Sequence, residues 1–144
     1  MSKRFFLDAN VLFSAAWQDG KARALFPLAK KTGAALQSSP HAINEARKNL
    51  EAKRPETLRR FSELLAQIEV VPEPPPALVS EALKLGLPLK DAPILAAAWQ
   101  AGAHALVTGD RKHFGALLGK TAKGTKILSP AEAFQKLLNE ARKR

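Results

Sequence analysis

The sequence contains no cysteine and no long hydrophobic run. Without cysteine the chain can form no disulfide and offers no thiolate to a metal ion, which suits a reducing cytosol. No apolar stretch approaches the roughly 18–20 residues needed to span a bilayer. Only three apolar residues, Phe5, Phe6 and Leu7, separate the basic N-terminus from Asp8, too few for the core of a signal peptide. These absences predict a cytoplasmic protein with no membrane-spanning segment.

Acidic residues are also scarce. Thirteen aspartates and glutamates face 23 lysines and arginines, giving a net charge of +10 and a pI near 10.2. Six basic residues cluster within a short stretch: Arg47, Lys48, Lys53, Arg54, Arg59 and Arg60. Such a cluster is either a solvated helical face or a surface for phosphate groups, and the lack of acids to offset it favours a polyanionic partner.

Strand and helix patterns alternate along the 144 residues. Buried strand patterns cover residues 4–8, 34–37, 69–71, 104–108 and 126–128. Helical spacing covers residues 10–17, 21–32, 40–53, 55–68, 78–85, 92–101 and 130–141. Alternating strands and helices predict an α/β fold, a three-layer α/β/α sandwich around a mostly parallel sheet of about five strands. The length fits one domain over residues 1–144.

Three of the four aspartates lie at the ends of these elements. Asp8 and Asp110 each follow a strand pattern, and Asp91 opens a helix. Parallel sheets bind ligands at the carboxyl ends of their strands, so Asp8 and Asp110 are expected to share one edge. Helix capping is the alternative explanation for each aspartate. Glu45 stands in the second turn of the helix that begins at Pro40, near the same edge, although a lone glutamate there can also be an ordinary surface residue.

The ordered segments LDANVL, INEARKNL, KDAPILAAAWQAG and ALVTGD resemble the PIN domain family of ribonucleases, which includes the VapC-like toxins of toxin–antitoxin pairs. The resemblance covers the chain from Phe5 to Leu128. It implies that the catalytic and metal-binding acids are Asp8, Glu45, Asp91 and Asp110. It also implies that Thr108 and Asn10 are polar residues lining the same site.

Four carboxylates in one place require a compensating cation. Ligands that are all oxygen favour Mg²⁺ or Mn²⁺, and such ions activate water and hold phosphate oxygens. Basic residues are expected to bind the flanking phosphates of a nucleic acid: Arg47, Lys48, Lys53, Arg54, Arg111 and Lys112.

One segment departs from the family pattern. Many family members carry a further acid after the glycine-aspartate pair, where this chain has Arg111, Lys112 and His113. That departure leaves a site for one metal ion as credible as a site for two. His113 is interpreted as an ordinary surface histidine, with phosphate contact or proton relay as the alternative.

These features together predict a Mg²⁺- or Mn²⁺-dependent endoribonuclease that acts on RNA, the toxin of a toxin–antitoxin system. The alternative is a catalytically inactive RNA-binding module of the same fold. A phosphoryl-transfer protein is disfavoured because position 10 is asparagine, where a dehalogenase-like protein carries a second acid. The resemblance also implies a small antitoxin partner and a homodimer, with Trp17 or Trp99 packing in the core or at the subunit interface.

Overall fold

The computed structural model describes residues 3–143, and its centre is one six-stranded sheet. The strand order is β3-β2-β1-β4-β6-β5. All neighbouring strands are parallel except β5, which runs antiparallel to β6. The strands are β1 (Arg4–Leu7), β2 (Ala35–Ser38), β3 (Glu69–Val70), β4 (Ala105–Val107), β5 (Thr121–Ala122) and β6 (Thr125–Leu128).

Helices fill every crossover between the parallel strands. They are α1 (Ala9–Trp17), α2 (Lys21–Thr32), α3 (Pro40–Lys53), α4 (Leu58–Leu65), α5 (Pro76–Leu83), α6 (Ala92–Gln100), α7 (Arg111–Phe114) and α8 (Pro130–Arg142), with short 3-10 turns at Pro55–Thr57 and Gly115–Leu117. Local sequence sets several of these ends. Ser39 caps α3 in front of Pro40, and Ser129 and Glu132 form a reciprocal capping box on α8. Gly33 ends α2 in the left-handed conformation that glycine adopts most easily.

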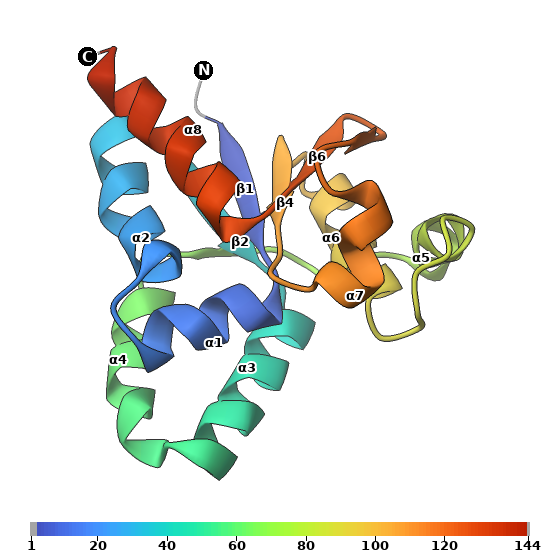
Figure 1. Cartoon of the computed structure of the whole chain (residues 1–144). Helices are drawn as coiled ribbons and strands as arrows, with labels where there is room; N and C mark the ends of the chain where they lie inside the picture. The colour runs from blue at the N-terminus through green and yellow to red at the C-terminus, as the bar shows by residue number, and fades with distance from the viewer. Residues whose placement is uncertain (1–2, 144) are drawn as a thin grey trace.

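The helices lie on both sides of the sheet (Figure 1). From β1 the chain moves outward to β2 and β3, and then crosses to β4 on the other side of β1. Right-handed crossovers in opposite directions place their helices on opposite faces. In Figure 1, α2 and α8 accordingly pack together on one side of the sheet, and α6 and α7 lie on the other.

The reversal of direction creates a switch point between β1 and β4. Leu7 pairs with Val107, so the residues that follow these two strands emerge side by side. The backbone N–H of Asp8 donates to the carbonyl oxygen of Val107 at 3.0 Å. Because the loops from β1 and β4 part in opposite directions there, the sheet edge opens into a crevice, the usual place for a ligand in such folds.

The predicted fold class is confirmed. The sheet has six strands instead of about five because a two-residue strand, β5, pairs with β6 after the turn around Lys123 and Gly124. Helix α5 begins at Pro76, two residues before the predicted start at residue 78, since proline is well suited to the first turn of a helix. Within residues 3–143, no helix is long and apolar enough to cross a membrane.

Helix α6 is enclosed almost completely. Ala92, Ala96, Ala97 and Ala98 have no exposed surface, and the helix packs against both β4 and α5. Small side chains on every buried side let α6 lie close to its neighbours, and this fixes the position of Asp91 at its start.

We predict that Ala96→Leu lowers the free energy of unfolding by about 1–3 kcal/mol, because a larger side chain has no room in a fully packed core. Chemical denaturation would measure the change. Ala77→Leu, at an exposed position of α5, is the matched control and should change stability by less than about 0.5 kcal/mol. Equal effects of the two substitutions would contradict the tight packing of α6.

Candidate functional site

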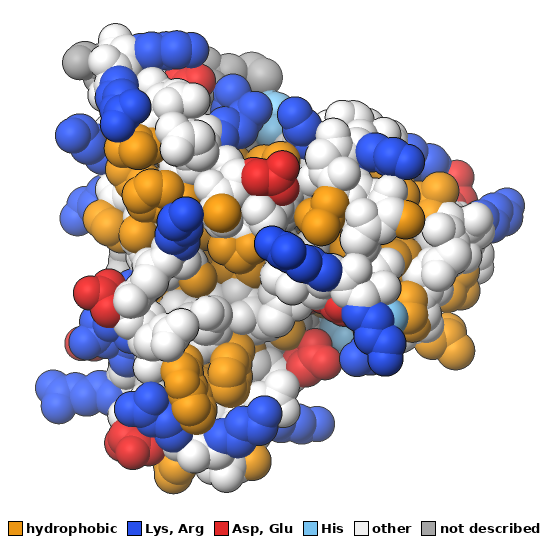
Figure 2. Space-filling model, viewed as in Figure 1, with side chains coloured by type: hydrophobic (Ala, Val, Ile, Leu, Met, Phe, Trp, Pro, Cys, Tyr) orange, Lys and Arg blue, Asp and Glu red, His pale blue; other side chains and the backbone are white. Residues whose placement is uncertain are grey.

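The switch point opens into a cleft of about 380 Å³. Its walls come from four separate parts of the chain: the end of β1 with helix α1, helix α3, the start of α6, and the loop and helix after β4. The lining residues are Asp8, Ala9, Asn10, Phe13, Glu45, Asn49, Lys53, Lys90, Asp91, Gly109, Asp110 and His113. Figure 2 shows acidic and histidine side chains together in a hollow, with lysine and arginine side chains around it. All four acids predicted from the sequence therefore line one cleft.

Asp8 is the most deeply buried of the acids, with 3% of its surface exposed. Its carboxylate accepts hydrogen bonds from the Ala9 backbone N–H at 2.7 Å and from the Thr108 hydroxyl at 2.8 Å. Burial raises the pKa of Asp8 to about 6, and the charges of Asp91 and Glu45 add to the rise, although the hydrogen bonds oppose it. The fold thus places a carboxylate where ionisation is costly.

Asn10 and Thr108 tie the loop after β1 to the loop after β4. The Asn10 amide donates to Asp8 Oδ2 and to Thr108 Oγ1, both at 3.3 Å, and its oxygen accepts from the Gly109 N–H at 2.7 Å. The Thr108 hydroxyl also accepts from the Asp110 N–H at 3.1 Å. A Cβ atom on residue 109 would lie 3.3 Å from Asn10 Oδ1, so glycine permits this close approach. These two polar residues hold Asp8 and Asp110 in fixed relative positions.

Asp91 precedes α6 but its side chain does not cap the helix. The residue is 7% exposed, and its Oδ2 is buried without accepting a hydrogen bond from the described residues. Burial raises the pKa of Asp91, and the nearby charge of Asp110 contributes, while a positive charge on His113 acts in the opposite direction. Helix capping by the side chain therefore does not explain Asp91, and the charged neighbour of its Oδ2 is the His113 ring, with Nδ1 3.2 Å away.

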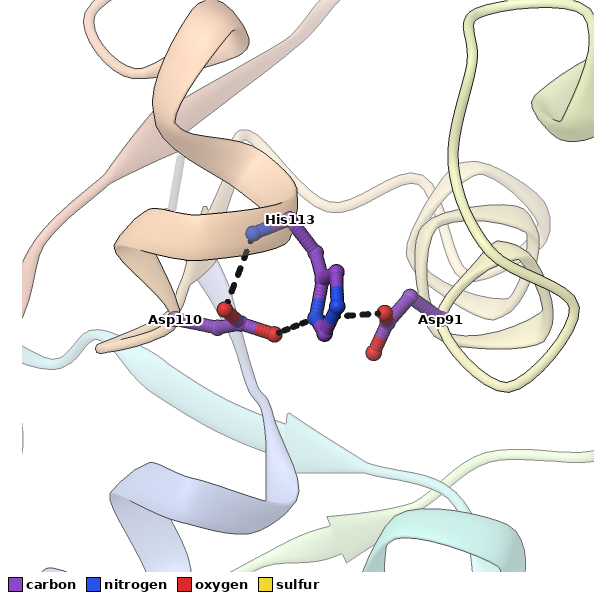
Figure 3. Close-up of side chains that lie close together, drawn as sticks. All are labelled: Asp91, Asp110 and His113. Carbon is purple, nitrogen blue, oxygen red and sulfur yellow. Dashed lines mark hydrogen bonds and ion pairs between the residues drawn. The ribbon is translucent and has the colours of Figure 1, made fainter.

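Asp110 and His113 form a pair at the start of α7 (Figure 3). Asp110 Oδ1 accepts from the His113 backbone N–H at 3.0 Å, and Oδ2 lies 2.7 Å from His113 Nδ1. Burial acts to raise the pKa of Asp110, but the hydrogen bonds and charge of His113 outweigh it and hold that pKa below its usual range. The His113 ring also reaches Asp91, with Nδ1 3.2 Å from Asp91 Oδ2. The imidazole thus lies between two carboxylates.

Helix α3 forms the opposite wall. Glu45, Asn49 and Lys53 are exposed, line the cleft and follow one another at intervals of four residues. That spacing puts them in a row along one side of the helix, about 6 Å apart. The wall changes along this row from an acid near the sheet to a cation at the far end.

The other basic residues predicted to bind nucleic acid are not among the residues that line the cleft. Lys48 lines an adjoining hollow of about 450 Å³ that also includes Glu45 and Lys90. The guanidinium groups of Arg47 and Arg54 lie 5.6 Å and 4.6 Å from the ring centres of Phe61 and Trp17. Arg111 and Lys112 are exposed on α7.

Part of the cleft could hold a divalent cation. Asp91, Asp110 and His113 each offer a ligand atom within 4.8 Å of the others, whereas Asp8 and Glu45 line the same cleft without belonging to this group. Carboxylate oxygens suit Mg²⁺ and Mn²⁺. A bound cation would compensate the burial that raises the pKa values of Asp8 and Asp91.

Two of the aspartates combine this role with helix capping. Asp8 accepts from the first N–H of α1, and Asp110 accepts from an N–H in the first turn of α7. Each carboxylate uses only part of its acceptor capacity in this way. Capping and a place in the cleft are therefore compatible at these two positions.

The interpretation of His113 as an ordinary surface histidine is wrong. The side chain is 23% exposed and lies against two carboxylates. Its position three residues after Asp110, the cap of α7, is the signal that could have placed it there. Lys90, Phe13 and Asn49 also line the cleft and were not among the predicted site residues, because no motif marks them.

The comparisons with known proteins agree with this architecture. A family model for the PIN domain matches residues 4–112, and the chain therefore belongs to the PIN domain family. This confirms the resemblance seen in the sequence. A comparison with curated protein sequences gave no match.

Solved structures show the same fold. PAE2754 from Pyrobaculum aerophilum is 22% identical, with a TM-score of 0.68 over 96% of this chain and 99% of that one. VapBC2 from Rickettsia felis, bound to a DNA fragment from their promoter, is 16% identical, with a TM-score of 0.66 over 88% and 98% of the two chains. VapC20 from Mycobacterium tuberculosis, a toxin that cleaves the sarcin-ricin loop, is 15% identical, with a TM-score of 0.56 over 78% and 94%. The chain is thus VapC-like in fold.

We predict a characteristic pH dependence of stability for the metal-free protein. The pKa of Asp8 is about 6 in the folded chain against an ordinary value of 3.8, so the folded state binds the proton more tightly. Protonation of Asp8 therefore contributes up to about 3 kcal/mol to the free energy of unfolding. The contribution is complete below about pH 4 and is lost as the pH rises through about 6.

Comparison with Asp8→Asn isolates this contribution, because asparagine does not titrate. Denaturation in the presence of a chelator should show the stability of the wild type falling relative to that of the variant between about pH 4 and pH 7. Excess Mn²⁺ should restore wild-type stability above pH 6 and leave the variant less affected. A difference between the two proteins that stays constant with pH would contradict the burial argument.

Proposed function

We propose that this PIN domain protein is a metal-dependent endoribonuclease, the toxin of a toxin–antitoxin system. The observation that carries the proposal is the gathering of Asp8, Glu45, Asp91 and Asp110 in one cleft, together with an Asp91 oxygen that accepts no hydrogen bond among the described residues. The PIN domain match over residues 4–112 supports a nuclease. The similarity in fold to VapC20, a sarcin-ricin loop cleaving toxin, supports RNA as the substrate.

In this proposal Asp8, Asp91 and Asp110 hold Mg²⁺ or Mn²⁺, assisted by Glu45. When bound, such an ion lowers the pKa of water and stabilises the charge that develops on the phosphate. Asn10 and Thr108 orient Asp8 through their hydrogen bonds to its carboxylate. The burial of Asp8 and Asp91 makes their negative charges act in a medium of lower dielectric, where they attract a cation more strongly than they would in water.

The rim of the cleft is suited to the phosphates on either side of the reacting one. Lys53 stands at the far end of the α3 row, and Lys90 directly precedes Asp91. Both are exposed, so they can contact a phosphate without large desolvation. Lys48 extends the basic side of the cleft into the adjoining hollow, while Arg47, Arg54, Arg111 and Lys112 are proposed to contribute to the wider positive field.

The proposed partners follow from the family. VapBC and FitAB structures are among the similar folds, and we propose that a small antitoxin covers the cleft and inserts a basic side chain among its acids. We also propose a homodimer. Co-expression with the product of the adjacent gene, followed by a growth assay, tests the first point, and light scattering of the purified chain tests the second.

Cleavage of single-stranded RNA with Mn²⁺ or Mg²⁺ present tests the activity itself. Asp8→Asn and Asp91→Asn should each lower the cleavage rate at least about 100-fold, since each removes a charge that holds the ion. Asp19→Asn is the matched control, because Asp19 is exposed outside the cleft, and it should cleave like the wild type.

Unchanged cleavage by Asp8→Asn would overturn the assignment of the metal site. If the wild type binds RNA but cleaves it under no metal condition, the chain is the inactive RNA-binding module instead. Measuring binding and cleavage on the same RNA separates these outcomes.

The roles of the rim lysines are tested by salt dependence. Each contact with a phosphate of a single strand contributes about 0.7 to the slope of log affinity against log salt concentration. Lys53→Ala and Lys90→Ala, each combined with Asp8→Asn to prevent cleavage, should therefore each reduce that slope by about 0.7. Lys31→Ala, at the exposed end of α2, should leave the slope unchanged, and an equal effect at Lys31 would indicate binding by net charge alone.

A further inference from the structure

His113 is the feature of the cleft that neither the acidic residues nor the family match accounts for. We propose that its Nδ1 atom is a direct metal ligand, which with Asp91 and Asp110 forms a mixed nitrogen and oxygen site that selects a transition-metal ion such as Mn²⁺ or Co²⁺ over Mg²⁺. This inference depends on one part of the proposed function, that the cleft binds a metal ion, and does not depend on ribonuclease activity.

The spacing of the three side chains matches a coordination sphere. His113 Nδ1 lies 2.7 Å from Asp110 Oδ2 and 3.2 Å from Asp91 Oδ2. One ligand atom from each of the three residues lies within 4.8 Å of the others. Neighbouring ligands of an octahedral ion about 2.1 Å away are separated by about 3 Å, and opposite ligands by about 4.2 Å. The two separations between His113 and the carboxylates are therefore close to the spacing of neighbouring ligands around one ion.

The burial and direction of Asp91 agree with a place in this coordination sphere. The residue is more than nine-tenths buried, and its Oδ2, the atom nearest the imidazole, accepts no hydrogen bond from the described residues. Its close neighbour is the imidazole, with Nδ1 3.2 Å from Oδ2. Figure 3 shows the Asp91 side chain directed toward the ring of His113, so this carboxylate oxygen faces the centre of the proposed site.

The position of His113 is fixed by the local fold. Its backbone N–H donates to Asp110 Oδ1, and the next residue, Phe114, has no exposed surface. Helix α7 therefore starts with a bonded cap and ends at a residue anchored in the core. The imidazole is presented to the carboxylates with little conformational freedom left to lose on binding an ion, which favours affinity.

The nitrogen donor changes which metal the site prefers. Mg²⁺ favours oxygen ligands in strict octahedral geometry, whereas imidazole suits borderline transition metals. Coordination uses the lone pair of Nδ1, with the remaining proton on Nε2. A site built only from carboxylates would show less discrimination between Mn²⁺ and Mg²⁺.

The competing explanation is that the imidazole itself serves as the cation between Asp91 and Asp110. The two explanations predict opposite effects of removing the ring. A ligand, when lost, weakens metal binding; an internal cation, when lost, frees the two carboxylates and strengthens it.

The test is metal titration of the purified full-length protein after treatment with a chelator. The electron paramagnetic resonance signal of free Mn²⁺ and the visible absorption of bound Co²⁺ report binding without reference to nuclease activity, and calorimetry reports Mg²⁺. His113→Ala should weaken Mn²⁺ and Co²⁺ binding at least about tenfold, and the Co²⁺ spectrum should change because a nitrogen ligand is lost.

His113→Asp is the more specific variant, because its carboxylate reaches the same distance from the backbone as Nδ1. It should narrow the preference for Mn²⁺ over Mg²⁺ by restoring a set of oxygen ligands only. His41→Ala is the matched control, since His41 lies outside the three-residue group, and it should bind metals like the wild type.

Unchanged or tighter Mn²⁺ and Co²⁺ binding by His113→Ala, or an unaltered Co²⁺ spectrum, would overturn the proposal while leaving the ribonuclease assignment intact. A different outcome is also possible: His113→Ala loses metal binding, and the wild type binds metal but cleaves no RNA. That result would support the metal site and refute the nuclease.

Discussion

The mutual repulsion and burial of carboxylates at one sheet edge is the constraint on which the site depends. Two such charges about 4 Å apart repel by roughly 4 kcal/mol at an effective dielectric of 20. The pKa values of Asp8 and Asp91 are accordingly raised, mainly by burial. Folding opposes this cost through the packing of the strands and helices that carry the acids, among them the enclosed helix α6. A site that concentrates negative charge in this way is energetically suited to a cation.

Topology brings these charges together without any local motif. Asp8 and Thr108 are 100 residues apart, yet their side chains are hydrogen-bonded at 2.8 Å because β1 and β4 are parallel neighbours. The residues that follow the two strands must meet at the switch point, and Asn10 and Gly109 join the loops there. The hydrogen bonds of the backbone thus determine where the side chains stand, and the polar network then fixes their relative positions.

This explains which parts of the structure could be predicted from the sequence. Strand and helix periodicity, together with caps such as Ser39 and Ser129, determine the alternation of elements, and the rules for parallel sheets then place Asp8 and Asp110 at one edge. The two-residue strand β5 could not be predicted, since its pairing depends on a turn and on the neighbouring strand. Lys90 and His113 were missed for a different reason. A lysine beside an acid has no distinctive pattern. The spacing of three residues between Asp110 and His113 becomes informative only when Asp110 is known to cap a helix, and the packed loops show which way each side chain points.

The contrast between centre and rim bears on how the cleft can recognise a nucleic acid. A polyanion approaching the acids directly would be repelled, so attraction has to come from the surrounding cations until a metal ion reverses the charge at the centre. Lys53 on α3 and Lys90 before α6 both line the cleft together with the acids. The net charge of +10 adds a positive field over the rest of the surface. The imidazole between Asp91 and Asp110 affects the net charge of the cleft centre. A histidine ligand would add affinity for an ion without adding the negative charge that a further carboxylate brings. If His113 binds the ion as proposed, the chain keeps a donor atom where many family members carry a further acid after Asp110, and the centre of the cleft would be less repulsive to a phosphate group.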